Sequence, residues 1–158
     1  MKNAALMLMA FSLMAQSDLP KATERSRAMN QDPSIDYYDS VSDYFRTTPR
    51  AVIAINQKGI AVEEIPAVLI IARRSAASPN QIIDAHKAGK SWSDIAKENK
   101  VNLPGEKFAD EANIIFLSEY HARPIEEVRA MRAKGATFVA INQEYRRNGA
   151  ALPKKTAK

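Results

Sequence analysis

A motif that runs from a proline to a glycine and on to two apolar residues occurs three times in this chain. The copies read PRAVIAINQKG, PNQIIDAHKAG and PIEEVRAMRAKG, and they begin at Pro49, Pro79 and Pro124. Apolar residues stand three and six positions after each glycine, and they are Val62, Ile65, Trp92, Ile95, Phe138 and Ile141. The first two copies are offset by 30 residues, and an insertion around 101–111 displaces the third. A period in this range is typical of stacked helical repeats, so we expect these six residues to form a repeated core.

The residues within each copy predict a helix, a tight turn and a second helix. Proline fits the first turn of a helix because its missing N–H would be unpaired there. Glycine ends a helix because it adopts positive φ at little cost. Ser78 and Gln81 have the spacing of a capping box around the start of the second copy. An apolar residue also recurs four positions after each proline, as Ile53, Ile83 and Val128.

The repeats predict the fold class. No segment alternates between apolar and polar residues as a half-buried strand does. We therefore expect an all-α protein of about seven or eight helices over residues 41–147, with three helix-turn-helix-like repeats in an α-solenoid-like or compact bundle arrangement. Apolar helices around 62–74 and 109–121 should connect the copies. No copy can bury its apolar face alone, so neighbouring copies must complete the core.

The amino-terminal segment has the pattern of an export signal. Lys2 precedes an uncharged apolar run at 4–15, and small residues follow at Ala15 and Ser17. Twelve residues at about 1.5 Å each are too short to cross a hydrocarbon layer of about 30 Å. We therefore expect a signal peptide at 1–17, no membrane span after its cleavage, and a periplasmic or secreted protein. The charged, proline-containing stretch at 18–40 then predicts a linker.

The basic balance of the chain is concentrated at its carboxyl end. The sequence has 23 Lys and Arg residues against 18 Asp and Glu residues. Five basic residues follow the last acidic residue, and they are Arg146, Arg147, Lys154, Lys155 and Lys158. Residues 148–158 therefore form a basic tail, and the five residues are candidates for polyanion binding. The body before them is slightly acidic.

Few residues of this chain are suited to catalysis or metal binding. There is no Cys, and His86 and His121 are the only histidines. Zinc fingers, iron-sulfur clusters and thiol catalysis are therefore excluded. Both histidines are expected to be structural or surface residues. The sequence predicts no catalytic residue, no metal ligand and no cofactor.

Two adjacent pairs of glutamates could be proposed as an acid and a base. They are Glu63 with Glu64, and Glu126 with Glu127. Neighbouring residues on a helix point in different directions, and acidic residues are favoured near helix starts. We therefore interpret both pairs as helix-start charges. Trp92 could stack on a ligand, but its place in the repeat predicts core packing.

The segment from 82 to 104 resembles the first half of a DNA-reading helix-turn-helix. The helix that follows should then carry Arg, Asn or Gln toward base edges. Instead the chain continues with Leu103, Pro104 and Gly105, and then with Asp110 and Glu111. Acidic residues at that helix start would be repelled by phosphates, which weighs against nucleic acid as the partner.

Two blocks of the repeat region resemble a group of proteins. The blocks IIDAHKAGKSWSDIA and IIFLSEYHARPIEEVRAMRAKGATFVAIN, together with the export signal, resemble small exported bacterial helical-repeat proteins of unassigned function. The resemblance covers about residues 41–147 and implies export and an all-α fold, but no functional residues. Tetratricopeptide repeats have a similar length, yet their aromatic, Leu-Gly and Tyr pattern is missing.

Three classes of function stay open on the sequence alone. We favour a non-enzymatic interaction or scaffold protein of the cell envelope, which binds an unknown protein partner through its stacked helices. The alternative is nucleic-acid or polyanion binding through the helix-turn-helix-like block and the basic tail. The third is an enzyme whose site is assembled across the repeats.

Overall fold

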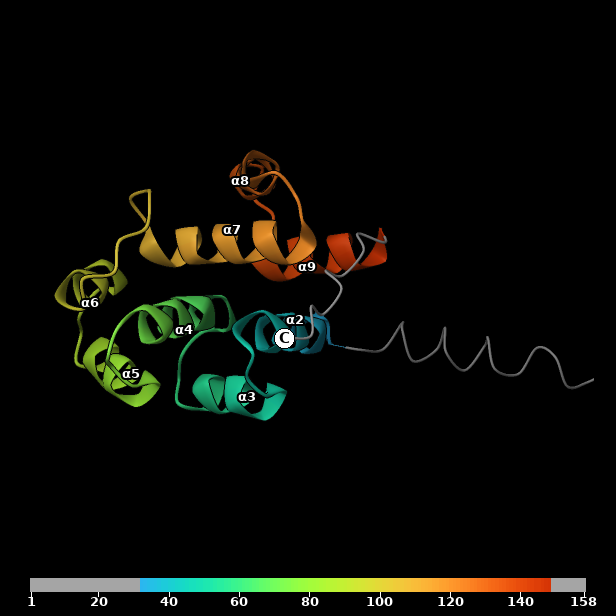
Figure 1. The fold of residues 1–158 in the computed structure, drawn as a ribbon. Coiled ribbons are helices and arrows are strands. Elements are labelled where there is room, and N and C mark those ends of the chain that lie inside the picture. The colour runs from blue at the N-terminus through green and yellow to red at the C-terminus, as the bar shows by residue number, and fades with distance from the viewer. Residues whose placement is uncertain (1–31, 149–158) are drawn as a thin grey trace, which may run out of the picture. The chain divides into compact units, whose positions relative to one another are not determined.

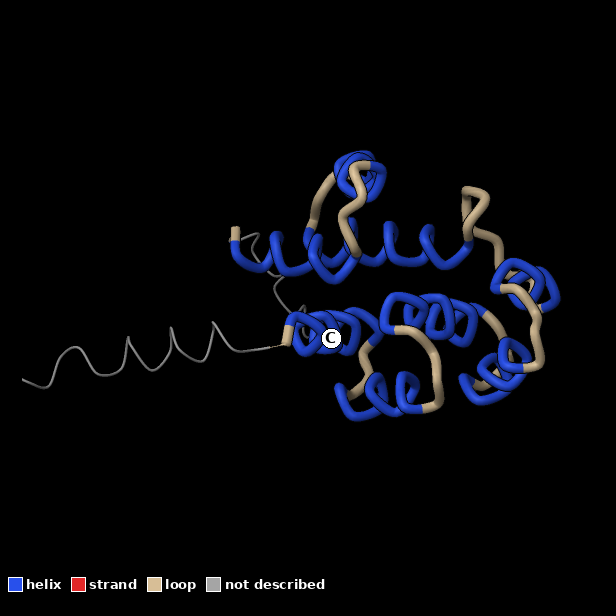
Figure 2. Tube along the Cα trace, turned by 180° about the vertical axis from the view of Figure 1, so that it is seen from behind, coloured by secondary structure: helices blue, strands red, loops and turns tan. Residues whose placement is uncertain are grey.

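The protein is helical throughout the part that its computed structural model describes, residues 32–148. The expected leader at 1–17 and all but Asn148 of the expected basic tail lie outside this part. The described residues form eight α-helices and one 3-10 helix, η1, and contain no strand (Figures 1 and 2). The helices are α2 (Pro33–Phe45), α3 (Pro49–Gln57), η1 (Val62–Glu64), α4 (Ile65–Arg74), α5 (Pro79–Lys87), α6 (Trp92–Glu98), α7 (Phe108–His121), α8 (Ile125–Ala133) and α9 (Phe138–Arg147). The predicted all-α fold class is confirmed.

None of the helices in residues 32–148 combines the length and the apolar character that crossing a membrane requires.

The helical domain begins at Pro33 and not at Val41, so the expected linker was wrong over its last residues. Helix α2 starts at Pro33, and Tyr37, Ser40 and Val41 on it are buried. Tyr37 and Val41 are four positions apart, so they share one face of a helix. Of the acidic residues that indicated a linker, Asp36 and Asp39 lie on the less buried sides of α2.

Each proline-to-glycine copy forms the helix, turn and helix that its residues predict. The first unit comprises α3, η1 and α4, the second comprises α5 and α6, and the third comprises α8 and α9. The capping box of Ser78 and Gln81 is present at the start of α5, and Thr48 caps α3. The glycines that end α3, α5 and α8 have positive φ angles of 91°, 95° and 92°. An L-residue rarely adopts that conformation, which explains the glycine at each turn.

Each turn is also held by a side chain that lies three positions before its glycine. This side chain bonds the backbone carbonyl of the residue after the glycine, which the sequence analysis did not predict. The three pairs are Asn56 Nδ2 with Ile60 O at 2.9 Å, His86 Nδ1 with Lys90 O at 3.0 Å, and Arg132 Nη1 with Ala136 O at 3.3 Å. Three different side chains therefore make the equivalent hydrogen bond in the three units. The units thus repeat in structure even where their residue types differ.

Helix α7 lies at the centre of the domain and belongs to none of the three units. It packs between α4 and α8 (Figure 1) and also contacts η1, α2, α6 and α9. Nine of its 14 residues are buried, including the apolar Ile114, Phe116 and Leu117. Every unit therefore completes its core against α7.

The first and last described helices are in contact, which makes the packing of the domain compact. Helix α2 packs against α9 as well as against α3. Arg146 on α9 reaches across this contact, with its Nη2 atom 3.5 Å from Asp36 Oδ1. In an open solenoid each repeat contacts only its neighbours. Of the two arrangements that the sequence left open, the compact one is observed.

The buried residues match most of the predicted core. Ile65, Trp92, Ile95, Phe138 and Ile141 are all buried, while Val62 is half-buried. Four positions after the prolines, Ile83 and Val128 are buried, but Ile53 is 38% exposed. The shared repeat position therefore does not determine whether this residue is buried. Its neighbour Val52 occupies the core instead, because α3 packs mainly against α2 on one side.

The pair Ile83 and Ile53 tests this difference directly. Both stand four positions after the helix-starting proline, so a change to Ala alters helix propensity equally in both. We expect Ile83→Ala to lower the free energy of unfolding by about 2 to 4 kcal/mol, because it leaves a cavity. Ile53→Ala should cost about 0.5 kcal/mol or less, as surface changes do. Urea melts of both variants measure this, and equal losses would mean that the core is misplaced.

Candidate functional site

The adjacent carboxylates of η1 point to different units of the repeat. Glu63 Oε1 accepts a hydrogen bond from the backbone N–H of Val139, 3.1 Å away in the first turn of α9. Glu64 Oε1 accepts a hydrogen bond from Trp92 Nε1, 2.9 Å away at the start of α6. One glutamate therefore holds the third unit and the other holds the second unit. This arrangement joins units and does not form an acid and base pair.

Arg132 extends the joint around Glu63. Its Nη1 atom lies 3.9 Å from Glu63 Oε2, and its Nη2 atom lies 3.5 Å from Asp110 Oδ1. The guanidinium carbon also lies 4.5 Å from the centre of the Phe138 ring, which is a cation–π distance. Arg132 thereby connects α8 to η1, α7 and α9.

Trp92 is part of the joint between the first and second units. His86 stacks on the indole ring with 3.9 Å between ring centroids and 18° between planes. His86 Nε2 lies 4.0 Å from Glu64 Oε1, the atom that also accepts the Trp92 hydrogen bond. Trp92 is 8% exposed, so the prediction of core packing is confirmed and its ring is not open to a ligand. His86 is occupied in holding the turn and the indole.

An ion pair with a buried carboxylate fixes α8 on α7. Arg129 donates two parallel hydrogen bonds to Glu111, with lengths of 2.6 and 2.7 Å. Glu111 is 5% exposed, while the Arg129 side chain is 33% exposed, so the carboxylate is removed from water and the guanidinium is only partly covered. Gly105 lies over it with φ of 107°, and a Cβ atom there would meet Glu111 Oε1 at 2.5 Å. The glycine therefore allows the loop before α7 to cover the carboxylate.

Asn113 is a fully buried amide on α7 that sequence analysis missed. Its Nδ2 atom donates to Glu63 O at 2.5 Å and to Ala109 O at 2.9 Å. Its Oδ1 atom accepts a hydrogen bond from the Tyr37 hydroxyl. Burial raises the pKa of Tyr37, so this phenol stays protonated and can donate. The amide therefore joins α2 and η1 to α7. The sequence feature that could have indicated this buried amide is the lone Asn within the apolar run ANIIFL.

His121 lies in a second buried polar cluster, between α7 and α9. Its Nε2 atom is 2.8 Å from Asn142 Oδ1, and both residues are at most 1% exposed. Burial lowers the pKa of His121, and the nearby Arg146 and Arg123 lower it further. Burial and the charge of Glu127 raise the pKa of Tyr145, beside it, to about 12. A neutral imidazole and a protonated phenol are therefore packed between the helices, as the structural interpretation of His121 predicts.

The candidate polyanion-binding residues are only partly described. Arg146 bonds Asp36 O at 3.5 Å and Ser40 Oγ at 3.2 Å, so it takes part in the contact of α9 with α2. Arg147 is exposed beside it. The remaining three candidates, Lys154, Lys155 and Lys158, lie outside the described residues.

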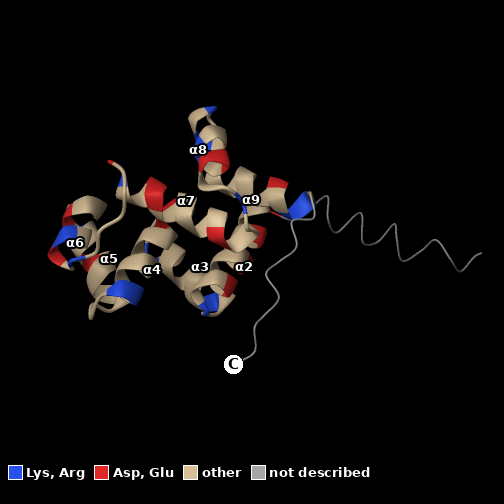
Figure 3. Ribbon diagram, turned by 45° about the horizontal axis from the view of Figure 1, so that its top comes forward, with Lys and Arg blue, Asp and Glu red and all other residues tan. Residues whose placement is uncertain are grey.

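The charges of the described residues are balanced. Residues 32–148 contain 16 basic and 16 acidic side chains. Figure 3 shows both signs interspersed over the helices. This part of the chain therefore has no net charge that would attract a polyanion over a distance.

The helix-turn-helix-like block has a buried helix in the place of a recognition helix. Helices α5 and α6 form its first half, and a loop over 99–107 leads into α7. A recognition helix must offer one face to the major groove. The acidic Asp110 and Glu111 near the start of α7 pair with Arg132 and Arg129. Helix α7 packs in the core, and the acidic residues at its start form ion pairs with α8.

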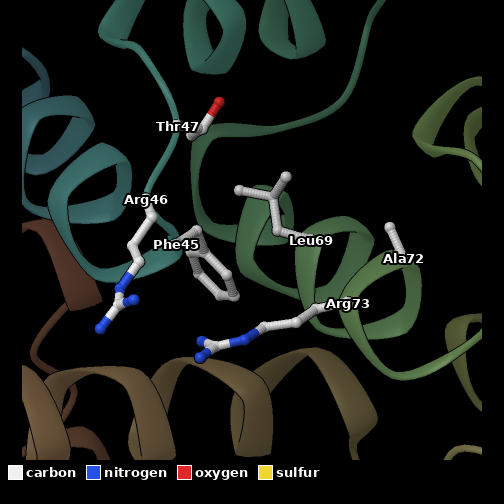
Figure 4. Close-up of a pocket in the computed structure, with 6 residues that line it drawn as sticks. All are labelled: Phe45, Arg46, Thr47, Leu69, Ala72 and Arg73. Carbon is white, nitrogen blue, oxygen red and sulfur yellow. The ribbon is translucent and has the colours of Figure 1, made fainter. Parts of the chain in front are cut away.

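A pocket of about 320 Å³ lies between the carboxyl end of α2 and helix α4 (Figure 4). We call it the α2–α4 pocket, and its walls are Phe45, Arg46, Thr47, Leu69, Ala72 and Arg73. Arg46 follows α2 with a φ angle of 56°, and Arg73 comes from the last turn of α4. Within the described part of the chain, neither arginine forms an ion pair. The pocket thus combines apolar walls with two cations that have no carboxylate partner.

Tyr44 positions one of these cations. The guanidinium carbon of Arg73 lies 5.8 Å from the centre of the Tyr44 ring. The Tyr44 hydroxyl donates a hydrogen bond to Glu119 Oε2 at 2.5 Å. Burial and this glutamate raise the pKa of Tyr44, so the phenol stays neutral. Sequence analysis did not single out the pocket, because its walls belong to segments that are distant along the chain.

No protein-family model, curated protein or solved structure matches this chain. The resemblance to small exported helical-repeat proteins therefore remains a prediction.

His121 should make the stability of the protein sensitive to acid. Its pKa is lowered in the folded state from an ordinary value of 6.5, so the unfolded chain binds its proton first. The stabilising contribution is complete above about pH 6.5 and is lost as the pH falls toward the folded pKa. We expect the free energy of unfolding to fall by up to about 1.4 kcal/mol per pH unit in that window from this group.

The measurement is a set of urea melts at pH 7.5, 6.5 and 5.5, with two variants for comparison. His121→Gln should remove this part of the pH dependence. His86→Gln, at the other histidine, should keep it. An unchanged pH profile in His121→Gln would contradict the assignment.

Proposed function

We propose that this protein is a non-enzymatic interaction protein of the bacterial cell envelope. The observation that carries the proposal is the distribution of the polar side chains. Glu63, Glu64 and Glu111 hold the units together, while Arg46 and Arg73 border a pocket without a carboxylate partner. These three carboxylates, which could otherwise transfer protons, are therefore occupied in packing. The two arginines, which can recognise an anion, are left available.

Other features of α2 and the helices next to it support a role in recognition. The α2–α4 pocket begins at the end of α2, and its wall residue Thr47 lies in the turn to α3. The described residues include two large apolar side chains that are exposed, Ile35 on α2 and Ile53 on α3. Arginine is enriched in the surfaces by which proteins bind one another, and the two isoleucines add exposed apolar area on α2 and α3. We place the interaction surface on α2, the turn to α3, and the α2–α4 pocket.

The envelope location rests on the sequence pattern of the first 17 residues. An envelope protein without a nucleic-acid partner also agrees with the balanced charge of residues 32–148. Binding to a polyanion through the basic tail is the competing function, and the experiment below separates the two.

The test is to express the full chain in a Gram-negative bacterium and to recover it from cell fractions. We expect periplasmic or secreted protein whose mass shows an amino terminus at Asp18. Zero-length crosslinking should then link the intact protein to the same partner as a chain that lacks residues 148–158. The contacts would come from the helices, so deletion of the tail should change the yield by less than about twofold.

Two results would contradict the proposal. One is a cytoplasmic protein that retains Met1. The other is tail-dependent retention on duplex DNA that weakens by orders of magnitude between about 50 and 200 mM salt, as phosphate binding does. The control for the DNA experiment is the same chain with Arg74→Gln, which removes a positive charge outside the pocket and outside the tail.

A further inference from the structure

We propose that the α2–α4 pocket binds the carboxyl-terminal residue of a partner polypeptide, with the apolar side chain in the pocket and the carboxylate on Arg46 and Arg73. This inference rests on the proposed interaction function and names the chemistry of its partner. It follows from the charge of the pocket, from the chemistry of its walls, and from the sides that the walls leave open.

The charges of the pocket select a carboxylate. Arg46 and Arg73 come from two different elements and reach the same pocket (Figure 4). A guanidinium group binds a carboxylate through two parallel hydrogen bonds. Arg129 and Glu111 make such a pair elsewhere in the domain, but no described carboxylate pairs with Arg46 or Arg73.

The carboxylate that contacts Tyr44, beside Arg73, is already engaged in a hydrogen bond. Glu119 accepts the hydrogen bond of the Tyr44 hydroxyl, and the ring of Tyr44 lies beside the Arg73 guanidinium. Arg73 is thereby held by an aromatic ring and keeps its charge for a ligand.

The walls and the volume of the pocket select one apolar side chain. Phe45, Leu69 and Ala72 supply carbon surfaces. A volume of about 320 Å³ corresponds to roughly ten water molecules at about 30 Å³ each. That space suits a single large side chain together with its carboxylate. The phosphate backbone of duplex DNA has no apolar group to occupy such walls.

The openness of the pocket favours the end of a chain over a free small molecule. Its walls come from only two places, residues 45–47 and helix α4. Sites for small molecules usually enclose most of the surface of the ligand. A pocket with walls on two sides instead leaves a path by which the rest of a polypeptide can depart. Capture of a terminal carboxylate is an established mode of peptide recognition.

The experiment is a titration of the ¹⁵N-labelled full chain with the peptide acetyl-Gly-Ser-Gly-Ser-Phe that has a free carboxyl terminus. We expect binding with a Kd between about 0.1 and 1 mM, as is reasonable for a contact of one residue. The amide signals of Thr47, Leu69 and Ala72 should shift. The same peptide with an amidated terminus should bind at least about tenfold more weakly, and so should a peptide that ends in Ser.

Variants of the two arginines assign the effect to the pocket. Arg73→Gln and Arg46→Asn should each weaken binding by about tenfold, and Asn is chosen because it tolerates the positive φ at position 46. Arg74→Gln is the matched control, because it removes the same charge from the next position of α4, outside the pocket. Unchanged amide spectra away from the pocket show that each variant is folded.

Several results would overturn the inference. They are equal binding of the free and amidated peptides, equal effects of Arg73→Gln and Arg74→Gln, and tighter binding of duplex DNA at the same amides. Binding of phenylacetate without binding of the peptide would exclude a polypeptide end as the ligand. If Arg73→Gln still crosslinks to the envelope partner at the wild-type yield, the interaction function stands and this site for it fails.

Discussion

The packing of α7 against every repeat unit is the constraint on which the rest of this structure depends. A helix-turn-helix of some 20 to 25 residues cannot bury its apolar face alone, so each unit needs an outside surface to complete its core. Helix α7 supplies that surface with Ile114, Phe116 and Leu117. Asn113 makes this contact specific. Its hydrogen bonds with the Tyr37 hydroxyl and with Glu63 O can form only when α2 and η1 lie in one position against α7.

This central packing determines what the charged side chains do. The two glutamates of η1 each hold a different unit, and the buried Glu111 holds α8 through its ion pair with Arg129. A buried carboxylate must be paired, since an unpaired one is strongly destabilising. These residues therefore stabilise one arrangement of units and leave recognition to the outer surface. There, the α2–α4 pocket has two arginines that no described carboxylate neutralises.

The parts of the structure that could be predicted from sequence are the ones that depend on neighbouring residues. The proline starts, the glycine turns and the cap at Ser78 are local, and all were predicted correctly. The joints made by Glu63 and Asn113 were missed, because they depend on which unit lies opposite. Ile53 shows the same limit, since it shares its repeat position with the buried Ile83 and Val128 but the neighbours of α3 leave it exposed. Arg46 and Arg73 are 27 positions apart, so only the folded chain brings them to one pocket.

Equilibrium unfolding followed by two probes tests the central role of α7 most directly. Trp92 is the only tryptophan in the chain, and its fluorescence reports the joint between the first and second units. Circular dichroism at 222 nm reports the helices of all units. If every unit depends on α7, the two signals must change together in urea with one midpoint. A Trp92 transition at a separate midpoint would show that the second unit folds on its own, as in an open repeat array, and would contradict this account.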